Sequence, residues 1–172
     1  MYVVKGDITR LKVDIIVNSA NKTLLGGGGL DGQIHLNAGP KLLEECKTLG
    51  GCHTGEAKMT KAYNLPADRV IHTVGPEYIN GYYDEKRLLK NCYINSMKLA
   101  EEYRKENDLN LVLIAFPSIS TGVFKYPKYE ACKIAVDTIK EINNPNIIVI
   151  FVCHGDMNYK YYLNEVNGIM LI

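Results

Sequence analysis

The chain has almost no excess of charge of either sign. Its 20 Lys and Arg residues are matched by 19 Asp and Glu residues, which leaves a formal net charge of +1 over 172 residues. A protein that holds nucleic acid by releasing counterions needs a broad basic surface, so this composition argues against a nucleic-acid-binding module. If the ligand is anionic, local backbone geometry must bind it.

Long hydrophobic runs are also missing. The longest, Ile147–Cys153, is far too short for a membrane span of about 20 residues and has the length of a buried strand. Lys5 and Asp7 interrupt the first residues, which therefore lack the continuous apolar core of a signal peptide. We expect a cytoplasmic protein without a membrane partner.

The cysteines do not form the pattern of a disulfide framework, because they are odd in number and scattered. They are Cys46, Cys52, Cys92, Cys132 and Cys153. We expect them to be reduced and mostly buried. Cys46, Cys52 and His53 come nearest to a metal site, but no CxxC pair or second ligand cluster accompanies them. The sequence therefore predicts no metal and no cofactor.

What the chain does contain is an alternation of short apolar runs with amphipathic segments. Its length fits one domain of about 100 to 200 residues, so we expect a single domain over residues 1–172. The runs predict strands at 2–5, 13–18, 57–63, 69–74, 111–116 and 146–153. Helical spacing predicts helices at 31–37, 40–47, 84–107, 127–143 and 158–166. This alternation is typical of an α/β sandwich.

The most informative segment is Val17–His35. A buried strand is followed by Asn21, by the four consecutive glycines Gly26–Gly29, and by a helix that opens near Asp31. Glycine backbones adopt positive φ and approach a ligand closely, and successive N–H groups form a nest for an anion. The helix N-terminus that follows suits a phosphate or diphosphate. The pattern is neither GxGxxG nor a P-loop, since no GK[ST] follows.

A second donor-rich loop lies between the predicted strand 111–116 and the helix at Pro127. Ser120, Thr121 and Gly122 offer hydroxyl and amide donors, and Phe124 offers an aromatic face. In open α/β sheets, ligands lie beyond the carboxyl ends of the strands, and both loops follow such ends. We therefore expect the two loops to close on one anion.

Of three further polar side chains, Asp7 and Asp31 have two readings each and His35 has one. Asp7 either accepts a hydrogen bond from an exocyclic amine such as that of adenine or caps a turn. Asp31 either caps its helix or holds a water beside the bound phosphate. His35 lies four residues after Asp31 on the same helix face, and its default role is that of a core histidine.

In this order and spacing, the motifs resemble the macrodomain family, and within it the MacroD-type hydrolase branch. The resemblance covers nearly the whole chain. It rests on Gly6-Asp-Ile-Thr9, Val17-Asn-Ser-Ala-Asn21, Gly26-Gly-Gly-Gly-Leu-Asp-Gly32, Ile34-His35, Ala38-Gly-Pro40, Thr54-Gly-Glu-Ala-Lys58, Val70-Ile-His-Thr-Val-Gly-Pro76 and Ser118-Ile-Ser-Thr-Gly-Val-Phe124. It implies a three-layer α/β/α sandwich around a mixed, largely parallel sheet, with ADP-ribose in a cleft at the strand ends.

The resemblance also implies a role for each site residue. Asp7 would bind the adenine amine, with Ile8 and Asn158 at the adenosine end. The diphosphate and distal ribose would be held by Ala20, Gly26, Gly27, Gly28, Gly29, Leu30, Ser118, Ser120, Thr121, Gly122, Val123 and Phe124. Asn21 would bind the distal ribose and Asp31 would orient the hydrolytic water, with help from His35. The motif leaves open whether Asp31 or the substrate's phosphate activates that water.

The implied function is that of a hydrolase without a cofactor. Members of this branch remove mono-ADP-ribose from Asp and Glu side chains of proteins and deacetylate O-acetyl-ADP-ribose. ADP-ribosylated nucleic-acid ends are a further substrate class that the resemblance leaves open, and the alternative function is that of a non-catalytic ADP-ribose reader. Ser19, Leu30 and Lys125 depart from the usual Ala, Val and Gly of the family, and Lys125 bears on the mobility and charge of the second loop.

Overall fold

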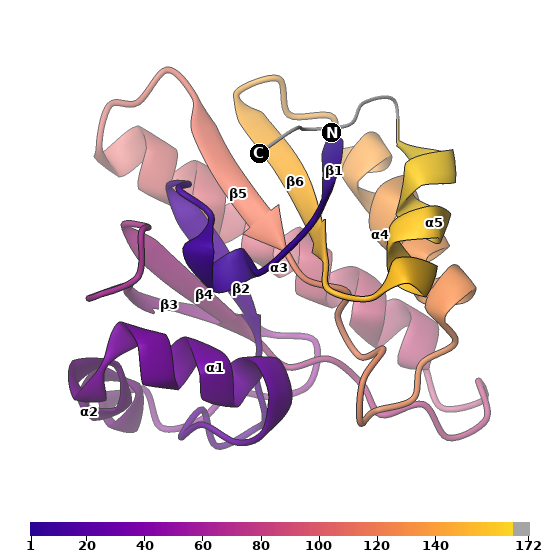
Figure 1. Ribbon diagram of the computed structural model, residues 1–172, viewed down its shortest axis with the longest axis horizontal. Coiled ribbons are helices and arrows are strands. Elements are labelled where there is room, and N and C mark those ends of the chain that lie inside the picture. Colours follow the sequence, from indigo (N-terminus) through magenta and orange to yellow (C-terminus); the bar gives the residue numbers. More distant parts are fainter. Residues whose placement is uncertain (167–172) are drawn as a thin grey trace.

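The computed structural model describes residues 1–166 and contains one six-stranded sheet in the order β1-β6-β5-β2-β4-β3 (Figure 1). The strands are β1 (Tyr2–Lys5), β2 (Ile15–Ser19), β3 (Ala57–Lys61), β4 (Arg69–Thr73), β5 (Val112–Phe116) and β6 (Ile147–Cys153). All neighbouring strands are parallel except β3, which is antiparallel to β4. The predicted mixed, largely parallel sheet is confirmed.

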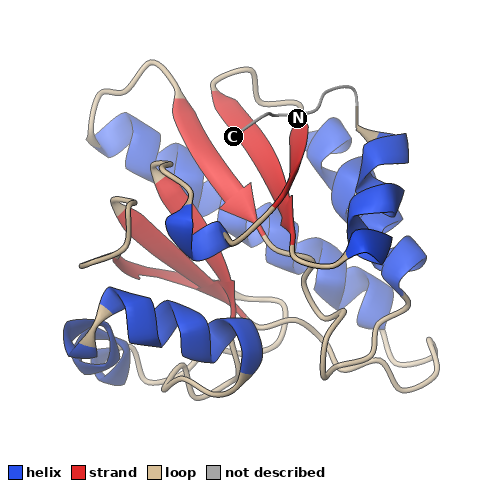
Figure 2. Cartoon of the chain, viewed as in Figure 1, coloured by secondary structure: helices blue, strands red, loops and turns tan. Residues whose placement is uncertain are grey.

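Helices cover both faces of this sheet (Figure 2). They are α1 (Gly29–Ala38), α2 (Pro40–Thr48), α3 (Glu85–Glu106), α4 (Lys128–Ile142) and α5 (Asp156–Glu165). Successive residues of a strand point to opposite faces, so Ile15 and Val17 pack with α3, α4 and α5, whereas Ile16 packs with α1 and α2. Strands that are apolar on both faces thus give two cores, and the three-layer sandwich follows.

Most element boundaries lie within two residues of the prediction, and the differences have local causes. Helix α1 begins at Gly29 rather than Asp31, because Gly28 occupies the N-cap position. Pro127 is the residue before α4 and not a member of its first turn. A short 3₁₀ helix, η1 (Ile8–Arg10), was not predicted, since three residues carry no periodic signal.

The fold brings together segments that are distant in the sequence. Because β1, β6, β5 and β2 are parallel neighbours, the residues after their carboxyl ends meet at one edge of the sheet. The five cysteines are free and buried, as predicted. Among the described residues, no helix combines the length and apolar character needed to cross a membrane.

Candidate functional site

A cavity of about 850 Å³ lies at this edge of the sheet. Its walls are the last residues of β2 and β6 and the segments that follow β1, β2, β5 and β6. They comprise Gly6, Asp7, Ile8, Ser19, Ala20, Asn21, Gly27, Gly28, Gly29, Leu30, Asp31, Gln33, Pro117, Ser118, Ser120, Thr121, Gly122, Val123, Phe124, Val152, His154, Gly155 and Asn158. Helices α1 and α5 both begin at this cavity, so two helix N-termini add partial positive charge to it.

The glycine run forms the turn that leads into α1. Gly26 and Gly29 have φ values of 86° and 58°, which a side chain would disfavour. Gly28 is the N-cap residue, and its neighbours are exposed at the cavity. Gly32, inside α1, lets the run pack against the helix, because a Cβ there would lie 2.5 Å from the carbonyl oxygen of Gly27. The arrangement gives first-turn N–H donors access to an anion.

The second loop is packed tightly against the first residues after β4. A Cβ on Gly75 would overlap Ser120 Oγ and lie 2.7 Å from Ile119 Cγ2. Ser120 and Lys125 adopt φ values of 65° and 54°. The left-handed backbone explains why glycine suits the position of Lys125. This lysine is exposed and does not line the cavity, so its charge is not part of the cavity wall.

Asp7 both caps η1 and lines the cavity. Its Oδ1 accepts hydrogen bonds from the Thr9 backbone N–H at 2.9 Å and from the Thr9 hydroxyl at 2.7 Å. Partial burial opposes ionisation, but the Thr9 bonds and the charge of Arg10 lower the pKa of Asp7 below its ordinary value. Oδ2 makes a longer contact of 3.7 Å with Nε of the exposed Arg10 and remains open to a ligand. One side chain can therefore cap η1 with Oδ1 and offer Oδ2 to a ligand in the cavity.

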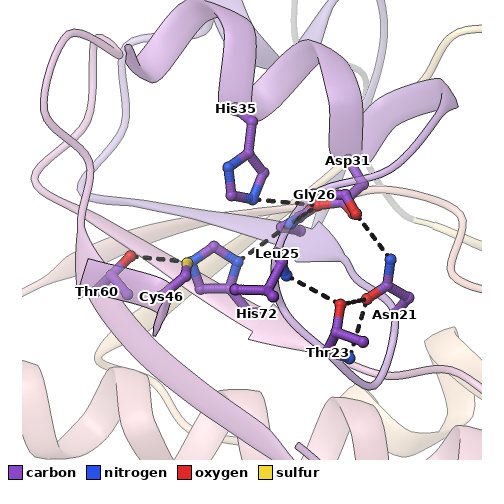
Figure 3. A network of polar contacts seen from close by, with 10 residues as sticks. Asn21, Thr23, Leu25, Gly26, Asp31, His35, Cys46, Thr60 and His72 are labelled. Carbon is purple, nitrogen blue, oxygen red and sulfur yellow. Dashed lines mark hydrogen bonds and ion pairs between the residues drawn. The ribbon is translucent and has the colours of Figure 1, made fainter. Parts of the chain in front are cut away.

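Asn21 closes the loop between β2 and the glycine run (Figure 3). Its Oδ1 accepts from Thr23 N at 3.0 Å and from Thr23 Oγ1 at 2.6 Å. Its Nδ2 donates to the Gly26 carbonyl at 2.9 Å. An amide nitrogen has two hydrogens, so one remains for a ligand. Asn21 therefore has a structural role besides any contact with ligand.

Asp31 is buried, with a relative exposure of 6%, and does not act as the helix cap. Its Oδ1 accepts from Asn18 Nδ2 at 2.7 Å. A Cβ on Gly27 would lie 3.3 Å from both Asp31 Oδ2 and Asn21 Nδ2, so the two polar groups flank the glycine run where it lines the cavity. No described residue donates to Oδ2, which is therefore the oxygen available to a ligand or water.

His35 lies behind Asp31. Its Nε2 is 3.6 Å from Asp31 Oδ1, and its ring stands 6.3 Å from that of His72, centroid to centroid. His72 is fully buried, and desolvation, with a smaller effect of His35, lowers its pKa to about 3. With Cys46, the two histidines bring potential ligand atoms within 4.8 Å of one another. Both ring nitrogens of His72 have hydrogen-bonding partners, so these contacts already account for its ring orientation.

The structure brings nearly all sequence-predicted site residues to one cavity. Gly26 and His35 do not line it: Gly26 packs against the ring of His35 underneath the glycine run. Sequence reasoning missed other wall residues, namely Gly6, Ser19, Gln33, Pro117, Val152, His154 and Gly155. His154 and Gly155 directly follow β6, so the rule that ligands lie beyond strand ends could have found them.

A family model described as "Macro domain" matches residues 17–135. The chain belongs to the macro domain family. A macro domain-containing protein of Chlorobaculum tepidum is 53% identical, with 94% of this chain and 92% of the relative covered. A protein of Escherichia fergusonii named O-acetyl-ADP-ribose deacetylase is 46% identical, with 94% of this chain and 92% of that protein covered.

Other macro domains extend the comparison to longer proteins and to solved structures. A human protein named ADP-ribose glycohydrolase MACROD2 is 49% identical. The match covers 95% of this chain but only 38% of that longer protein. The Oceanobacillus iheyensis macrodomain with ADP superposes with a TM-score of 0.86 at 40% identity, covering 95% of this chain and 87% of that one. The Trypanosoma brucei macrodomain in complex with ADP-ribose superposes with a TM-score of 0.82 at 40% identity, covering 94% of this chain and 67% of that one.

Proposed function

We propose that this macro domain binds ADP-ribose in the cavity and hydrolyses esters that link ADP-ribose to a carboxylic acid. The substrates are Asp and Glu side chains of mono-ADP-ribosylated proteins and O-acetyl-ADP-ribose. The observation that carries the proposal is the buried Asp31 carboxylate, whose Oδ1 is held by Asn18 while Oδ2 lies beside the glycine run at the cavity.

Binding follows from the distribution of donors and acceptors around the cavity. The diphosphate fits the glycine run and the N-terminus of α1, because backbone N–H groups and the helix dipole favour an anion. Asp7 Oδ2 suits the amine of adenine, which donates hydrogen bonds. Phe124, at the other loop, offers an apolar surface to the distal ribose. Related macrodomains solved with ADP or ADP-ribose support this assignment.

Hydrolysis needs a water placed beside the ester, and Asp31 is the group suited to hold it. A carboxylate whose one oxygen is fixed by an amide donor presents the other in a defined direction. A water donating to Oδ2 would be oriented toward a substrate held by the glycine run. Water then cleaves the ester, and the products are ADP-ribose with a free hydroxyl and the carboxylic acid.

A second function, that of a non-catalytic reader, draws support from Asn21. Its hydrogen bonds to Gly26 and Thr23 account for this residue by loop closure alone. A reader would bind ADP-ribose with the same loops and would leave the ester intact.

Turnover by the wild-type protein distinguishes the two functions. The protein is incubated with glutamate-linked ADP-ribosylated protein and, separately, with O-acetyl-ADP-ribose, with and without EDTA, and free ADP-ribose is measured as product. We expect release from both substrates and no effect of EDTA, because the proposed step uses no metal. Tight binding of ADP-ribose without release from either substrate would contradict the hydrolase and favour the reader. Loss of release on chelation, restored by metal, would contradict the metal-free mechanism.

A further inference from the structure

A chain of buried hydrogen bonds runs from Asp31 away from the cavity, across β2 and β4 to β3. Figure 3 shows Asp31, His72 and Thr60 of this chain. Asn18 Nδ2 lies 2.7 Å from Asp31 Oδ1 and 3.1 Å from His72 Nδ1. His72 Nε2 lies 2.9 Å from Thr60 Oγ1, which in turn lies 3.0 Å from the carbonyl oxygen of Lys61. Asn18, His72 and Thr60 are each at most 2% exposed. The chain therefore operates out of contact with solvent.

Each link of this chain has one permitted direction. The Asp31 carboxylate accepts, so Asn18 Nδ2 donates to it and also faces His72 Nδ1. His72 Nε2–H then donates to the Thr60 hydroxyl, which in turn donates to the Lys61 carbonyl. His72 is neutral because burial lowers its pKa to about 3, and its single ring proton is then on Nε2. Nδ1 is left as an acceptor for Asn18 Nδ2, whose other hydrogen goes to Asp31. The Thr60 hydroxyl thus accepts from the protonated ring nitrogen and stabilises this tautomer.

We propose that Thr60 is a positioning residue for the hydrolysis: it fixes the tautomer of His72, and through the Asn18 amide it keeps Asp31 Oδ2 turned toward the cavity. The proposal rests on the proposed function, because it gives Asp31 the task of orienting water. Thr60 itself does not line the cavity and touches no reacting atom.

The other tautomer would disrupt the same contacts. With the proton on Nδ1, the ring would face the hydrogens of Asn18 Nδ2, and the amide would have to rotate to present its oxygen. That oxygen would then also face Asp31 Oδ1, and the 2.7 Å bond would be replaced by a repulsive contact. Asp31 would lose the donor that sets its orientation.

Cys46 contacts the same ring nitrogen as Thr60 and favours the other tautomer. Its Sγ lies 3.7 Å from the same His72 Nε2. Burial raises the pKa of the Cys46 thiol to about 11, so the group is a thiol that donates weakly. A thiol donor favours an unprotonated Nε2, which is the tautomer that breaks the chain. Without the Thr60 hydroxyl, Cys46 is the remaining polar side chain that contacts Nε2 among the described residues.

The test compares Thr60→Val, which keeps the shape and removes the hydroxyl, with Thr60→Ser, which keeps the hydroxyl. Thr138→Val is the matched control, because it removes another buried hydroxyl that donates to a carbonyl, in α4 on the other face of the sheet. Nitrogen-15 chemical shifts of the His72 ring report the tautomer. Steady-state kinetics on O-acetyl-ADP-ribose give kcat and KM, and calorimetry gives the ADP-ribose affinity.

We expect Thr60→Val to move the ring proton to Nδ1 and to lower kcat by about ten- to a hundredfold, the size of effect that a 1 Å misplacement produces. KM and ADP-ribose affinity should stay within about twofold, and Thr60→Ser and Thr138→Val should match the wild type in tautomer and kcat. Thr60→Ala, read by the same measurements, replaces the valine variant if that variant does not fold.

Two results would overturn the positioning role while the proposed function stands: a His72 ring that keeps its proton on Nε2 in Thr60→Val, or a changed tautomer with wild-type kcat. A wild-type protein that hydrolyses neither substrate would instead contradict the proposed function, and the positioning role with it. The tautomer measurement does not depend on turnover, so the two failures are distinguishable.

Discussion

Two carboxylates of the cavity each use one oxygen to hold the fold and leave the other exposed to a ligand. Asp7 Oδ1 accepts from Thr9, and Asp31 Oδ1 accepts from Asn18. Truncation to alanine would remove both functions at once. Substitution by asparagine keeps one oxygen for the internal donor and replaces the other oxygen by an amide, so it separates fold from ligand binding at a single residue.

For Asp7→Asn we expect ADP-ribose affinity to fall about ten- to a hundredfold, which corresponds to about 1.5 to 3 kcal/mol for a hydrogen bond to a charged acceptor. The amide would present hydrogens to the amine of adenine in place of an acceptor. The cap on η1 should persist, so the unfolding temperature should change little. Calorimetry with free ADP-ribose measures the affinity, and an unchanged dissociation constant would show that Asp7 serves only as a cap.

The two loops that line the cavity are placed by contacts with neighbouring segments. The second loop sits on the residues after β4 because Gly75 has no side chain at the position of Ser120 Oγ. Tyr126 N donates to the Ser120 carbonyl at 2.9 Å and closes the loop on itself. The cavity wall at this loop thus depends on a glycine that does not line the cavity.

Gly75→Ala should push the second loop outward and destabilise the protein by about 1 to 3 kcal/mol, the usual cost of overpacking a tight contact. ADP-ribose affinity should fall with it, because the loop moves away from the ligand. Denaturant unfolding and calorimetry measure the two effects. Adding Ser120→Ala removes the overlapping hydroxyl, so the double variant should be less destabilised than the sum of the single variants; strict additivity would contradict this packing account.

The elements differ in how far the sequence predicts them. Strands that are apolar on both faces and the run Gly26–Gly29 carry local signals, so the sheet, the layers and a glycine loop at the strand ends could all be derived. The roles of Gly75 and Thr60 could not, because each depends on a contact with a residue more than ten positions away. The resemblance to macrodomains supplied Asn158, whose own spacing says little, and favoured the ligand-binding reading of Asp7, which the sequence alone left open beside the cap.

At the scale of the whole molecule, His72 couples the polar chain behind the cavity to acid stability. The pKa of the ring is about 3 in the folded protein and 6.5 in a solvated histidine. Between these values the unfolded chain binds a proton that the native protein does not. Stability should therefore fall as the pH drops below 6.5, with a contribution from His72 of up to about 1.4 kcal/mol for each pH unit.

Urea unfolding at a series of pH values from 7 to about 4 measures this slope. In His72→Gln the slope should be smaller by the contribution of one proton, whatever the stability of the variant at neutral pH. Equal slopes in the two proteins would mean that other groups cause the acid sensitivity.

If Asp31 orients the water that cleaves the ester, the Asp31→Asn variant should lose turnover and keep binding. Wild-type protein and Asp31→Asn are assayed for ADP-ribose release from O-acetyl-ADP-ribose and for ADP-ribose binding by calorimetry on the same preparations. The asparagine keeps an acceptor for Asn18 but loses the charge, so we expect the rate to fall about 10² to 10⁴-fold while the affinity changes by only a few-fold. A variant that turns over at the wild-type rate would contradict this role of Asp31, as would one that loses binding and turnover in equal measure.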